Sequence, residues 1–417
     1  MPITVALGQC GNQVSNCLTE LMWDEGLRDS FFVEKQNGKY YARNVLIDME
    51  PKVIENVLKK SEGKTWNYSK TAAITAKSGS GNNWAFGYSV LGDRNQESIQ
   101  RQIRKLAEDA DSVNDGFLVM LAMAGGTGSG VGSKTVEKIR EEYGSKVPII
   151  AHAVWPYSTG EVVVQNYNTL LTLNSLNCST DGVIFHQNSS ITDIIQTRFD
   201  LKNVAYSDIN DYVAKELASI LLPIKDTDGA LHKMPIYQIA VDLCGSPNFK
   251  CLTPRSLPQL HNPKRAFLTY SNDLLLKYMH QLCLTGNFNE NSGNMNMKSV
   301  VNKSLAMNAY IRGKNEGPEK IVGALNDSSI FSNKIPFSDR FNSYLAKKSF
   351  MKHETFLSTL SADQTLIDPL ETVLSQSWNM FNHRAFLHRY EAHSIDSDHF
   401  VNSFAHLEQL QHSLKNL

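Results

Sequence analysis

The chain has 417 residues with a formal net charge of −1, and 41% of its residues are hydrophobic. This length allows two or three domains of about 150 residues each, and the apolar content is sufficient for a large buried core. The near-neutral charge argues against binding to nucleic acid or to anionic membranes, and no apolar run approaches the roughly 20 residues of a transmembrane helix.

The first half of the chain alternates between short apolar stretches and amphipathic stretches. Such alternation predicts strands followed by helices, and therefore a doubly wound parallel sheet that binds ligands at the carboxyl ends of its strands. The predicted strands are 4–7, 45–47, 116–123, 147–154 and 183–185, and the predicted helices are 13–22, 53–59, 131–143, 161–176 and 191–199.

The second half begins with a long amphipathic helix, predicted over 208–222. Ser207 or Asp208 can cap its N-terminus, and Pro223 follows its last turn. Beyond this helix the periodic stretches become shorter. The remaining predicted elements are strands at 266–270 and 305–311, an Asn- and Ser-rich mobile loop at 287–304, and two helices at about 364–391 and 397–415.

A glycine-rich stretch, Ala-Gly-Gly-Thr-Gly-Ser-Gly-Val-Gly at 124–132, lies between a predicted strand and a predicted helix. Glycines at such a junction let the backbone approach a phosphate group, and the helix N-terminus supplies free N–H groups and positive dipole charge. The hydroxyls of Thr127 and Ser129 can add donors. The dinucleotide-binding and P-loop spacings both fail, since Ser133 occupies the place of the second P-loop glycine. The stretch predicts a phosphate-binding loop, with a flexible glycine-rich turn as the alternative.

Polar residues outside this loop also lie directly after predicted strands. They are Gln9, Glu50, Asn82 and Glu161. Because the carboxyl ends of parallel strands meet at one edge of a sheet, we expect these residues to share a crevice with the glycine-rich loop. Glu50 is the candidate ligand of Mg²⁺, because hard cations bind carboxylate and water oxygens. A surface acid beside a proline is the alternative for this residue.

The pattern GGTGSGxG resembles the glycine loop of the tubulins and of their bacterial division relatives. Further segments are similar to tubulin motifs in the same order along the chain, from residue 3 to about 410. The stretch 155–168 is more similar to delta chains than to alpha or beta chains, so the chain is identified as a member of the delta subfamily. The other matching segments are 8–13 (GQCGNQ), 48–51 (DMEP), 80–85 (SGNNWA), the stretch around Asn188, 207–210 (SDIN) and 384–388 (RAFLH).

The resemblance implies a tubulin-like domain that binds GTP or GDP with Mg²⁺, a long core helix, a smaller α+β second domain and a C-terminal helical hairpin. Asn82 is then the contact to the terminal phosphate, and Glu50 belongs to the Mg²⁺ shell. Asn188 and Asn210 form the pair that reads the purine edge, and Tyr206 stacks on the base. The full set of nucleotide-contacting residues is Gln9, Cys10, Asn82, Gly125, Gly126, Thr127, Gly128, Ser129, Gly130, Glu161, Asn188, Tyr206 and Asn210.

Several departures from the family pattern affect the nucleotide chemistry. Ala122 replaces the serine before the glycine loop. Gln165 stands where alpha and beta chains carry a ribose-contacting glutamate, and Glu161 can compensate. By the resemblance, Gln238 occupies the position of the acid with which alpha chains position the attacking water; glutamine can orient a water but cannot accept its proton. We therefore expect GTP binding with weak or absent hydrolysis by the isolated chain, and we assign no catalytic residue.

The resemblance also implies a cellular role and a domain division. A delta-type chain is implied to act in the cytoplasm at centrioles and basal bodies, where it supports triplet microtubules and cilium assembly. Its implied partners are other tubulins, namely alpha, beta and epsilon chains, and centriolar proteins. The alternatives are a divergent alpha or beta chain of the microtubule lattice and a metabolic enzyme that uses a nucleotide cofactor. The expected domains are 1–206 for nucleotide binding, 207–223 for the core helix, 224–360 for the intermediate α+β domain and 361–417 for the C-terminal helices.

Overall fold

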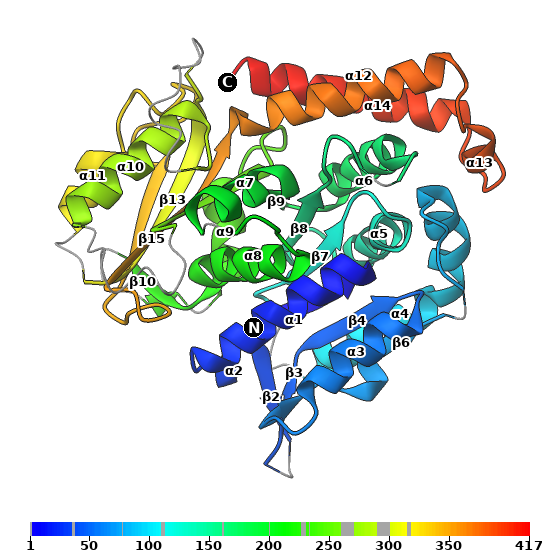
Figure 1. Cartoon of the computed structure of the whole chain (residues 1–417), viewed down its shortest axis with the longest axis horizontal. Coiled ribbons are helices and arrows are strands. Elements are labelled where there is room, and N and C mark those ends of the chain that lie inside the picture. The colour runs from blue at the N-terminus through cyan, green and yellow to red at the C-terminus, as the bar shows by residue number, and fades with distance from the viewer. Residues whose placement is uncertain are drawn as a thin grey trace.

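The fold is built on a 12-stranded sheet with helices packed against it (Figure 1). A smaller sheet combines β2 (Phe32–Glu34), β3 (Tyr40–Ala42) and β5 (Trp66–Asn67). The structure is a computed structural model, and it describes residues 2–35, 38–76, 78–109, 113–160, 162–199, 201–226, 231–232, 234–259, 271–289, 301–314 and 318–417.

One half of the large sheet consists of parallel strands. Across the sheet they are β6 (Ala73–Thr75), β4 (Asn44–Asp48), β1 (Ile3–Leu7), β7 (Phe117–Ala122), β8 (Ile149–Trp155), β9 (Gly182–Gln187) and β12 (Cys251–Leu257). From β1 the chain first adds strands on one side and then, from β7 on, adds them on the other side. The strand order therefore reverses between β1 and β7, which confirms the predicted doubly wound sheet.

The sheet continues without a break into the second half of the chain. β12 pairs antiparallel with β15 (Thr355–Asp363), and β15 pairs antiparallel with β13 (Ser304–Gly313), which contains the predicted strand 305–311. β14 (Phe341–Ala346), β10 (Ile224–Asp226) and β11 (Leu231–His232) complete the order. Backbone hydrogen bonds thus join the two halves. The predicted strand 266–270, and residues 290–300 of the predicted loop 287–304, lie outside the described residues.

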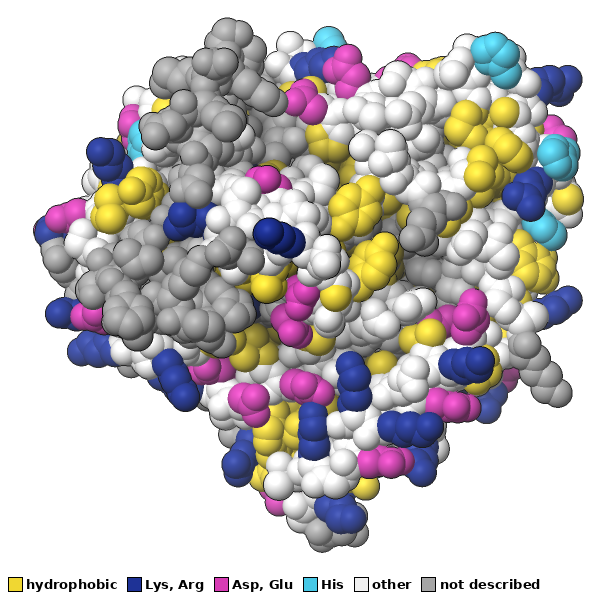
Figure 2. Space-filling view, viewed as in Figure 1, with side chains coloured by type: hydrophobic (Ala, Val, Ile, Leu, Met, Phe, Trp, Pro, Cys, Tyr) yellow, Lys and Arg dark blue, Asp and Glu magenta, His cyan; other side chains and the backbone are white. Residues whose placement is uncertain are grey.

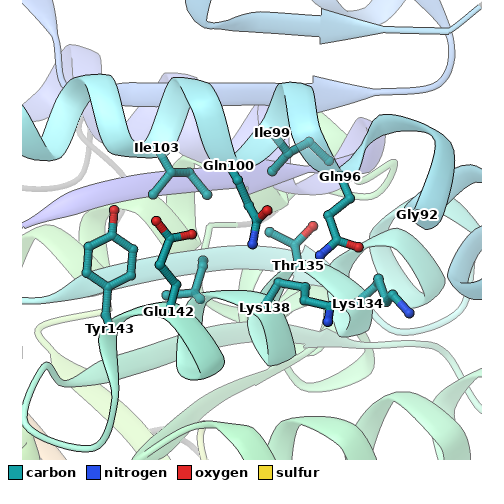
Figure 3. Close-up of a pocket in the computed structure, with 11 residues that line it drawn as sticks. Gly92, Gln96, Ile99, Gln100, Ile103, Lys134, Thr135, Lys138, Glu142 and Tyr143 are labelled. Atoms are coloured by element: carbon teal, nitrogen blue, oxygen red, sulfur yellow. The ribbon is translucent and has the colours of Figure 1, made fainter.

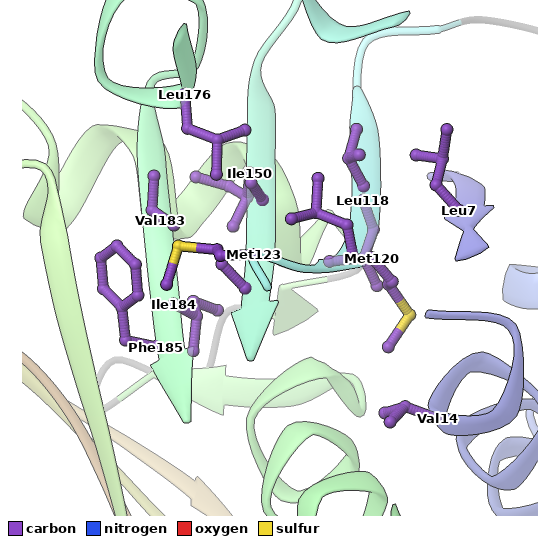
Figure 4. Close-up of a cluster of buried hydrophobic side chains, with 14 of the residues drawn as sticks. Leu7, Val14, Leu118, Met120, Met123, Ile150, Leu176, Val183, Ile184 and Phe185 are labelled. Atoms are coloured by element: carbon purple, nitrogen blue, oxygen red, sulfur yellow. The ribbon is translucent and has the colours of Figure 1, made fainter. Parts of the chain in front are cut away.

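The core lies on both faces of the parallel strands. Every residue of β1 and β8 is buried, as is typical of parallel strands that helices cover on both sides. Figure 4 shows Leu118, Ile150 and Ile184 on neighbouring strands of this core. Burying one such side chain contributes about 1.5–3 kcal/mol. On the outside, Figure 2 shows acidic and basic side chains interspersed among polar ones over the lower part of the face.

The helices follow the strands as the alternation predicts, with shifted boundaries. The predicted helix 161–176 begins later, at Gln165, and Glu161 lies outside the described residues. The helices of the first half are α1 (Gly8–Asp24), α2 (Arg28–Phe31), α3 (Pro51–Ser61), α4 (Asp93–Glu108), α5 (Gly132–Tyr143), α6 (Gln165–Ser179) and α7 (Asn188–Arg198). Those of the second half that precede the C-terminal pair are α9 (Pro235–Leu243), α10 (Asn272–Thr285) and α11 (Pro318–Leu325).

The long core helix is α8 (Tyr206–Leu221). The predicted cap at Ser207 or Asp208 is wrong, because the helix begins earlier and its N-cap is Ala205. Asp208 contributes differently: its carboxylate accepts a hydrogen bond from the Ala205 backbone N–H, 2.9 Å away. Negative charge in the first turn of a helix also stabilises it, because it interacts favourably with the positive end of the helix dipole.

A buried arginine from β13 closes the other end of α8. The Arg312 guanidinium donates to the carbonyl oxygens of Ser219 and Leu222 at 2.8 and 2.6 Å. These carbonyls belong to the last turn, where a helix leaves its C=O groups without partners. The core helix is therefore fastened to the second half of the sheet.

The C-terminal pair consists of α12 (Ile367–Asn382) and α14 (Ser397–Lys415), which lie side by side along one edge of the molecule (Figure 1). The predicted continuous helix 364–391 is interrupted, because Arg384 and Phe386 adopt left-handed φ values of 52° and 60°. A short helix, α13 (His388–Glu391), follows this break. The predicted helical hairpin is otherwise confirmed.

Candidate functional site

A cavity of about 570 Å³ opens at the carboxyl ends of the parallel strands. It lies beside β1 and β7, where the strand order reverses, which is the position at which open α/β sheets bind ligands. Its volume falls within the range of small-molecule sites, about 300–1,000 Å³. By comparison, the groove between α4 and α5 in Figure 3 offers only about 10 Å³, enough for a water molecule.

Most of the predicted nucleotide residues line this cavity. Ser129 and Gly130 are instead buried within the glycine loop, where the Ser129 hydroxyl donates to the Gly125 carbonyl oxygen. Glu161 lies outside the described residues. The predicted residues at the cavity wall are Gln9, Cys10, Glu50, Asn82, Gly125, Gly126, Thr127, Gly128, Asn188, Tyr206 and Asn210.

Three loops form the end of the cavity at which the sequence predicts phosphate binding, and they pack so closely that glycine is required. Gly8, directly after β1, has a left-handed φ of 72°, and a Cβ there would lie 2.8 Å from the backbone nitrogen of Gly128. A Cβ on Gly126 would lie 2.6 Å from the Ser80 hydroxyl oxygen. Backbone N–H groups of the loops and of the α1 N-terminus can therefore reach a ligand that side chains would otherwise displace.

The glycine loop leads into a π-helical turn, Thr127–Val131, before α5 begins. The Thr127 hydroxyl donates to the Ser80 hydroxyl at 3.1 Å, which ties the turn to the neighbouring loop. Asn82, next to Ser80 in that loop, has a left-handed φ of 51° and an exposed side chain. Such strained positions cluster at functional sites because the surrounding packing enforces them.

Two acids at the end of β4, Asp48 in its last position and Glu50 just after it, form a candidate Mg²⁺ site at the cavity wall. Asp48 Oδ1 accepts a hydrogen bond from the Glu50 backbone N–H at 3.1 Å, while the buried Oδ2 has no hydrogen-bond partner among the residues that the structure describes. Burial raises the pKa of Asp48 to about 6. An unpaired buried carboxylate oxygen beside a second acid fits a hard cation, and Mg²⁺ usually adds water and phosphate oxygens to one or two carboxylates.

The opposite end of the cavity is lined by amides and one aromatic ring. Asn210, on the first turns of α8, donates from Nδ2 to Gln13 Oε1 at 3.3 Å. Tyr206, at the start of the same helix, is 58% exposed and lines the cavity with its aromatic side chain. Asn188 begins α7 and also faces the cavity.

Sequence reasoning missed Asp48 and Gln13 as cavity residues. Asp48 ends a buried strand directly before the predicted Glu50, so its position at the strand end was the available signal. Gln13 follows Gln9 by one helical turn and therefore shares its face of α1.

Two further side chains at the cavity are Gln165, which is hydrogen-bonded within the protein, and Cys10, whose thiol is buried. The Gln165 amide, at the ribose position of the resemblance, donates from Nε2 to the Tyr157 carbonyl oxygen at 2.8 Å. Burial raises the pKa of the Cys10 thiol to about 12. Cys10 is therefore a neutral thiol and not a nucleophile, since thiolate is the reactive form.

Gln238 lies far from this cavity, beside the amino ends of the parallel strands. The Tyr237 backbone N–H in α9 donates to Asp115, which precedes β7, whereas the glycine loop follows β7. The Gln238 amide donates to Asp242 Oδ1 at 2.7 Å. A strand length thus separates Gln238 from the chain's own phosphate loops.

An open parallel sheet with a glycine loop at its switch point defines the class of α/β nucleotide-binding proteins. The Tubulin/FtsZ family, GTPase domain, matches residues 2–196. The chain is 34% identical to the tubulin delta chain of Canis lupus familiaris, 33% to that of Mus musculus and 34% to that of Homo sapiens. Each comparison covers 100% of this chain and 99% of the relative. The chain belongs to the tubulin family, in its delta subfamily.

None of the helices in the described ranges combines the length and the apolar character that a membrane crossing requires.

Proposed function

We propose that the chain binds GTP or GDP with Mg²⁺ in the cavity at the switch point, as a delta-type cytoskeletal tubulin. The observation that carries the proposal is the convergence of three close-packed loops and the Asp48–Glu50 acid pair on one wall of the cavity. This wall combines N–H donors for phosphate with carboxylates for the metal that accompanies phosphate.

Each residue has a role in this proposal. The backbone of Gln9, Cys10 and the glycine loop binds the phosphates, and Asn82 contacts the terminal one. Asp48 and Glu50 hold Mg²⁺ directly or through water. Asn188 and Asn210 read the purine edge, Tyr206 stacks on the base, and Glu161 remains the proposed ribose contact.

Two experiments test nucleotide and metal binding. The purified protein is denatured and the released nucleotide is identified by mass; GTP or GDP is expected, and NAD(P) would support a cofactor-dependent enzyme instead. In a titration, Glu50→Ala should weaken the Mg²⁺ dependence of GTP binding and leave metal-free GDP binding little changed. An unchanged Mg²⁺ requirement would remove Glu50 from the metal shell.

The proposed cellular role is in centrioles and basal bodies, where the chain supports triplet microtubules and cilium assembly. The similarity to delta chains over the full length supports this role. The proposed partners are alpha, beta and epsilon tubulins and centriolar proteins. Localisation of the tagged chain in ciliated cells, combined with a pull-down, tests both points; uniform incorporation along cytoplasmic microtubules would favour a lattice-forming chain.

A further inference from the structure

One buried amide links the loops of the cavity to the C-terminal part of the chain. The Asn168 side chain, on the first turn of α6, is fully buried. Its Nδ2 donates to the carbonyl oxygens of Asn82 and Ala124 at 2.9 and 2.7 Å. Its Oδ1 accepts from the Trp84 backbone N–H at 3.0 Å and from the Tyr390 hydroxyl at 2.7 Å. Both donors and both acceptor positions of this amide are therefore used.

The two carbonyl partners belong to different loops of the cavity. Asn82 lies in the loop proposed to contact the terminal phosphate, and Ala124 begins the glycine loop. A single amide that donates to both fixes the distance between the loops. Because Asn168 does not itself line the cavity, its effect on a ligand is indirect.

The residue that orients this amide comes from the C-terminal segment, here residues 387–399, which contains α13. Tyr390 is buried, with its ring 5.5 Å from the Tyr167 ring at 87° and 5.3 Å from the Phe400 ring. This packing fixes the ring, so the direction of the Tyr390 hydroxyl follows the position of the segment.

Further contacts fasten the same segment to the loop that carries Asn82. The Asn83 amide donates to the Arg389 carbonyl oxygen at 3.0 Å, and the Ser89 hydroxyl donates to the His393 carbonyl oxygen at 2.8 Å. The His393 ring also lies 5.0 Å from the Phe86 ring. These contacts join the segment both to the loop and to the helical turn Phe86–Gly92 that follows it.

We propose that Asn168 and Tyr390 are positioning residues that make the spacing of the phosphate loops depend on the C-terminal segment. The nucleotide-dependent part rests on the proposed function: a ligand that draws Asn82 toward its terminal phosphate also shifts the segment through Asn168. Linkage then applies: if a partner that displaces the segment binds the GTP form and the GDP form with different affinities, the ratio of those affinities equals the factor by which the partner changes the preference of the chain for GTP over GDP.

The test compares Tyr390→Phe with the control Tyr167→Phe in the full-length chain. Tyr390→Phe keeps the ring and removes the hydrogen bond to Asn168, whereas the Tyr167 hydroxyl is buried without a hydrogen-bond partner. Amide hydrogen exchange is measured without nucleotide. In Tyr390→Phe, peptides covering 82–87 and 124–130 should exchange about 3- to 10-fold faster, which corresponds to one lost hydrogen bond. In Tyr167→Phe, the exchange rates of these peptides should not change. Equal loop exchange in the two variants would overturn the proposal.

A nucleotide measurement separates this role from a merely structural one. The affinity ratio between a non-hydrolysable GTP analogue and GDP should fall about 3- to 10-fold in Tyr390→Phe and stay constant in Tyr167→Phe. In the unmodified chain, 387–399 should exchange more slowly with the analogue than with GDP. A changed loop exchange with an unchanged ratio would overturn the nucleotide-dependent part. A chain that binds neither nucleotide would contradict the proposed function, while faster loop exchange would still support positioning.

If Tyr390→Phe does not fold, Ser89→Ala replaces it. This substitution removes the hydroxyl that donates to the carbonyl oxygens of His393 and Ala85, and it leaves Asn168 in place. Faster exchange at 387–399 together with 82–87 supports the link between segment and loop, and a change confined to position 89 contradicts it.

Discussion

At the scale of single residues, the amides of Asn188 and Asn210 line the cavity, and the proposed function assigns them to the purine edge. Asn210 lines the cavity and donates from Nδ2 to Gln13 Oε1 at 3.3 Å. An amide offers both a donor and an acceptor to a base edge, whereas a carboxylate offers acceptors only. If Asn210 reads the base, we expect a substitution that changes one atom of this amide to alter the preference for guanine.

Asn210→Asp should weaken binding of GTP relative to xanthosine triphosphate by about tenfold or more, because the donor and acceptor pattern changes. A competition assay between the two nucleotides measures the ratio. An unchanged ratio would show that Asn210 does not read the base.

A second buried group concerns stability and not ligand binding. His152 in β8 is fully buried, with Nε2 3.0 Å from His186 Nδ1, and His186 Nε2 lies 3.0 Å from Glu216 Oε2 in α8. Burial and the neighbouring His186 hold the pKa of His152 well below its usual value near 6.5. In the unfolded chain this histidine binds a proton below about pH 6.5, but in the folded chain it stays neutral.

Above about pH 6.5, His152 should therefore not lower the free energy of unfolding. As the pH falls below about 6.5, the free energy of unfolding should decrease by up to about 1.4 kcal/mol per pH unit, because only the unfolded chain binds the proton. His152→Gln, which keeps a donor for His186, should reduce this acid slope. Denaturant titrations at pH 7 and pH 5 measure it, with His412→Gln on exposed α14 as control. An identical slope in both variants would assign the acid sensitivity elsewhere.

At the scale of elements, the core helix α8 depends on both halves of the chain. Its N-terminal residues line the cavity, and Arg312 from β13 satisfies carbonyls at its C-terminal end. Burial lowers the pKa of Arg312 to about 10, so the guanidinium remains charged near neutral pH. A positive group at this end also favours the helix dipole.

Arg312→Met should lower the free energy of unfolding by roughly 2–4 kcal/mol, because the buried carbonyls lose their donors. Lys314→Met is the matched control, since Lys314 lies just beyond the same strand with its side chain 77% exposed and 3.5 Å from Glu354. Denaturation midpoints measure both changes. A loss in Lys314→Met as large as in Arg312→Met would argue against the capping role.

At the scale of the whole molecule, the cavity lies at the carboxyl ends of the parallel strands, whereas the helix that carries Gln238 lies beside their amino ends. A phosphoryl transfer to water depends on positioning and charge, and one missing water-positioning group costs on the order of 10² to 10⁴ in rate. A single chain cannot bring its own α9 to its own phosphate loops. We therefore expect the nucleotide to act mainly as a structural ligand that stabilises the fold by mass action.

The isolated chain should hydrolyse GTP very slowly, and added alpha–beta dimer should raise the rate if an alpha-chain acid docks over the cavity. Phosphate release at several protein concentrations measures this. Turnover by the chain alone, proportional to its concentration and as fast as that of assembling alpha–beta tubulin, would contradict the expectation.

The sequence predicts the fold well where the pattern is local. Alternating strands and helices were sufficient for the doubly wound sheet, and strand ends were sufficient to predict that Gln9 and Glu50 lie at the wall of one cavity. The helix cap at Ser207 or Asp208 failed because the Asp208 carboxylate reaches back to Ala205. The role of Asn168 was out of reach, since its partner Tyr390 is 222 positions away and only the folded chain brings them together.

Because α8 lines the cavity at one end and is held by Arg312 at the other, the cavity depends on both halves of the chain. The family match ends at residue 196, but Tyr206 and Asn210 at the cavity wall come from the helix that follows. A fragment cut at that boundary would lack the base end of the cavity, and one cut after α8 would leave the helix without Arg312. We therefore expect that the cavity cannot be excised from this chain or transplanted as an independent unit, because the half that follows α8 holds the end of a helix that lines it.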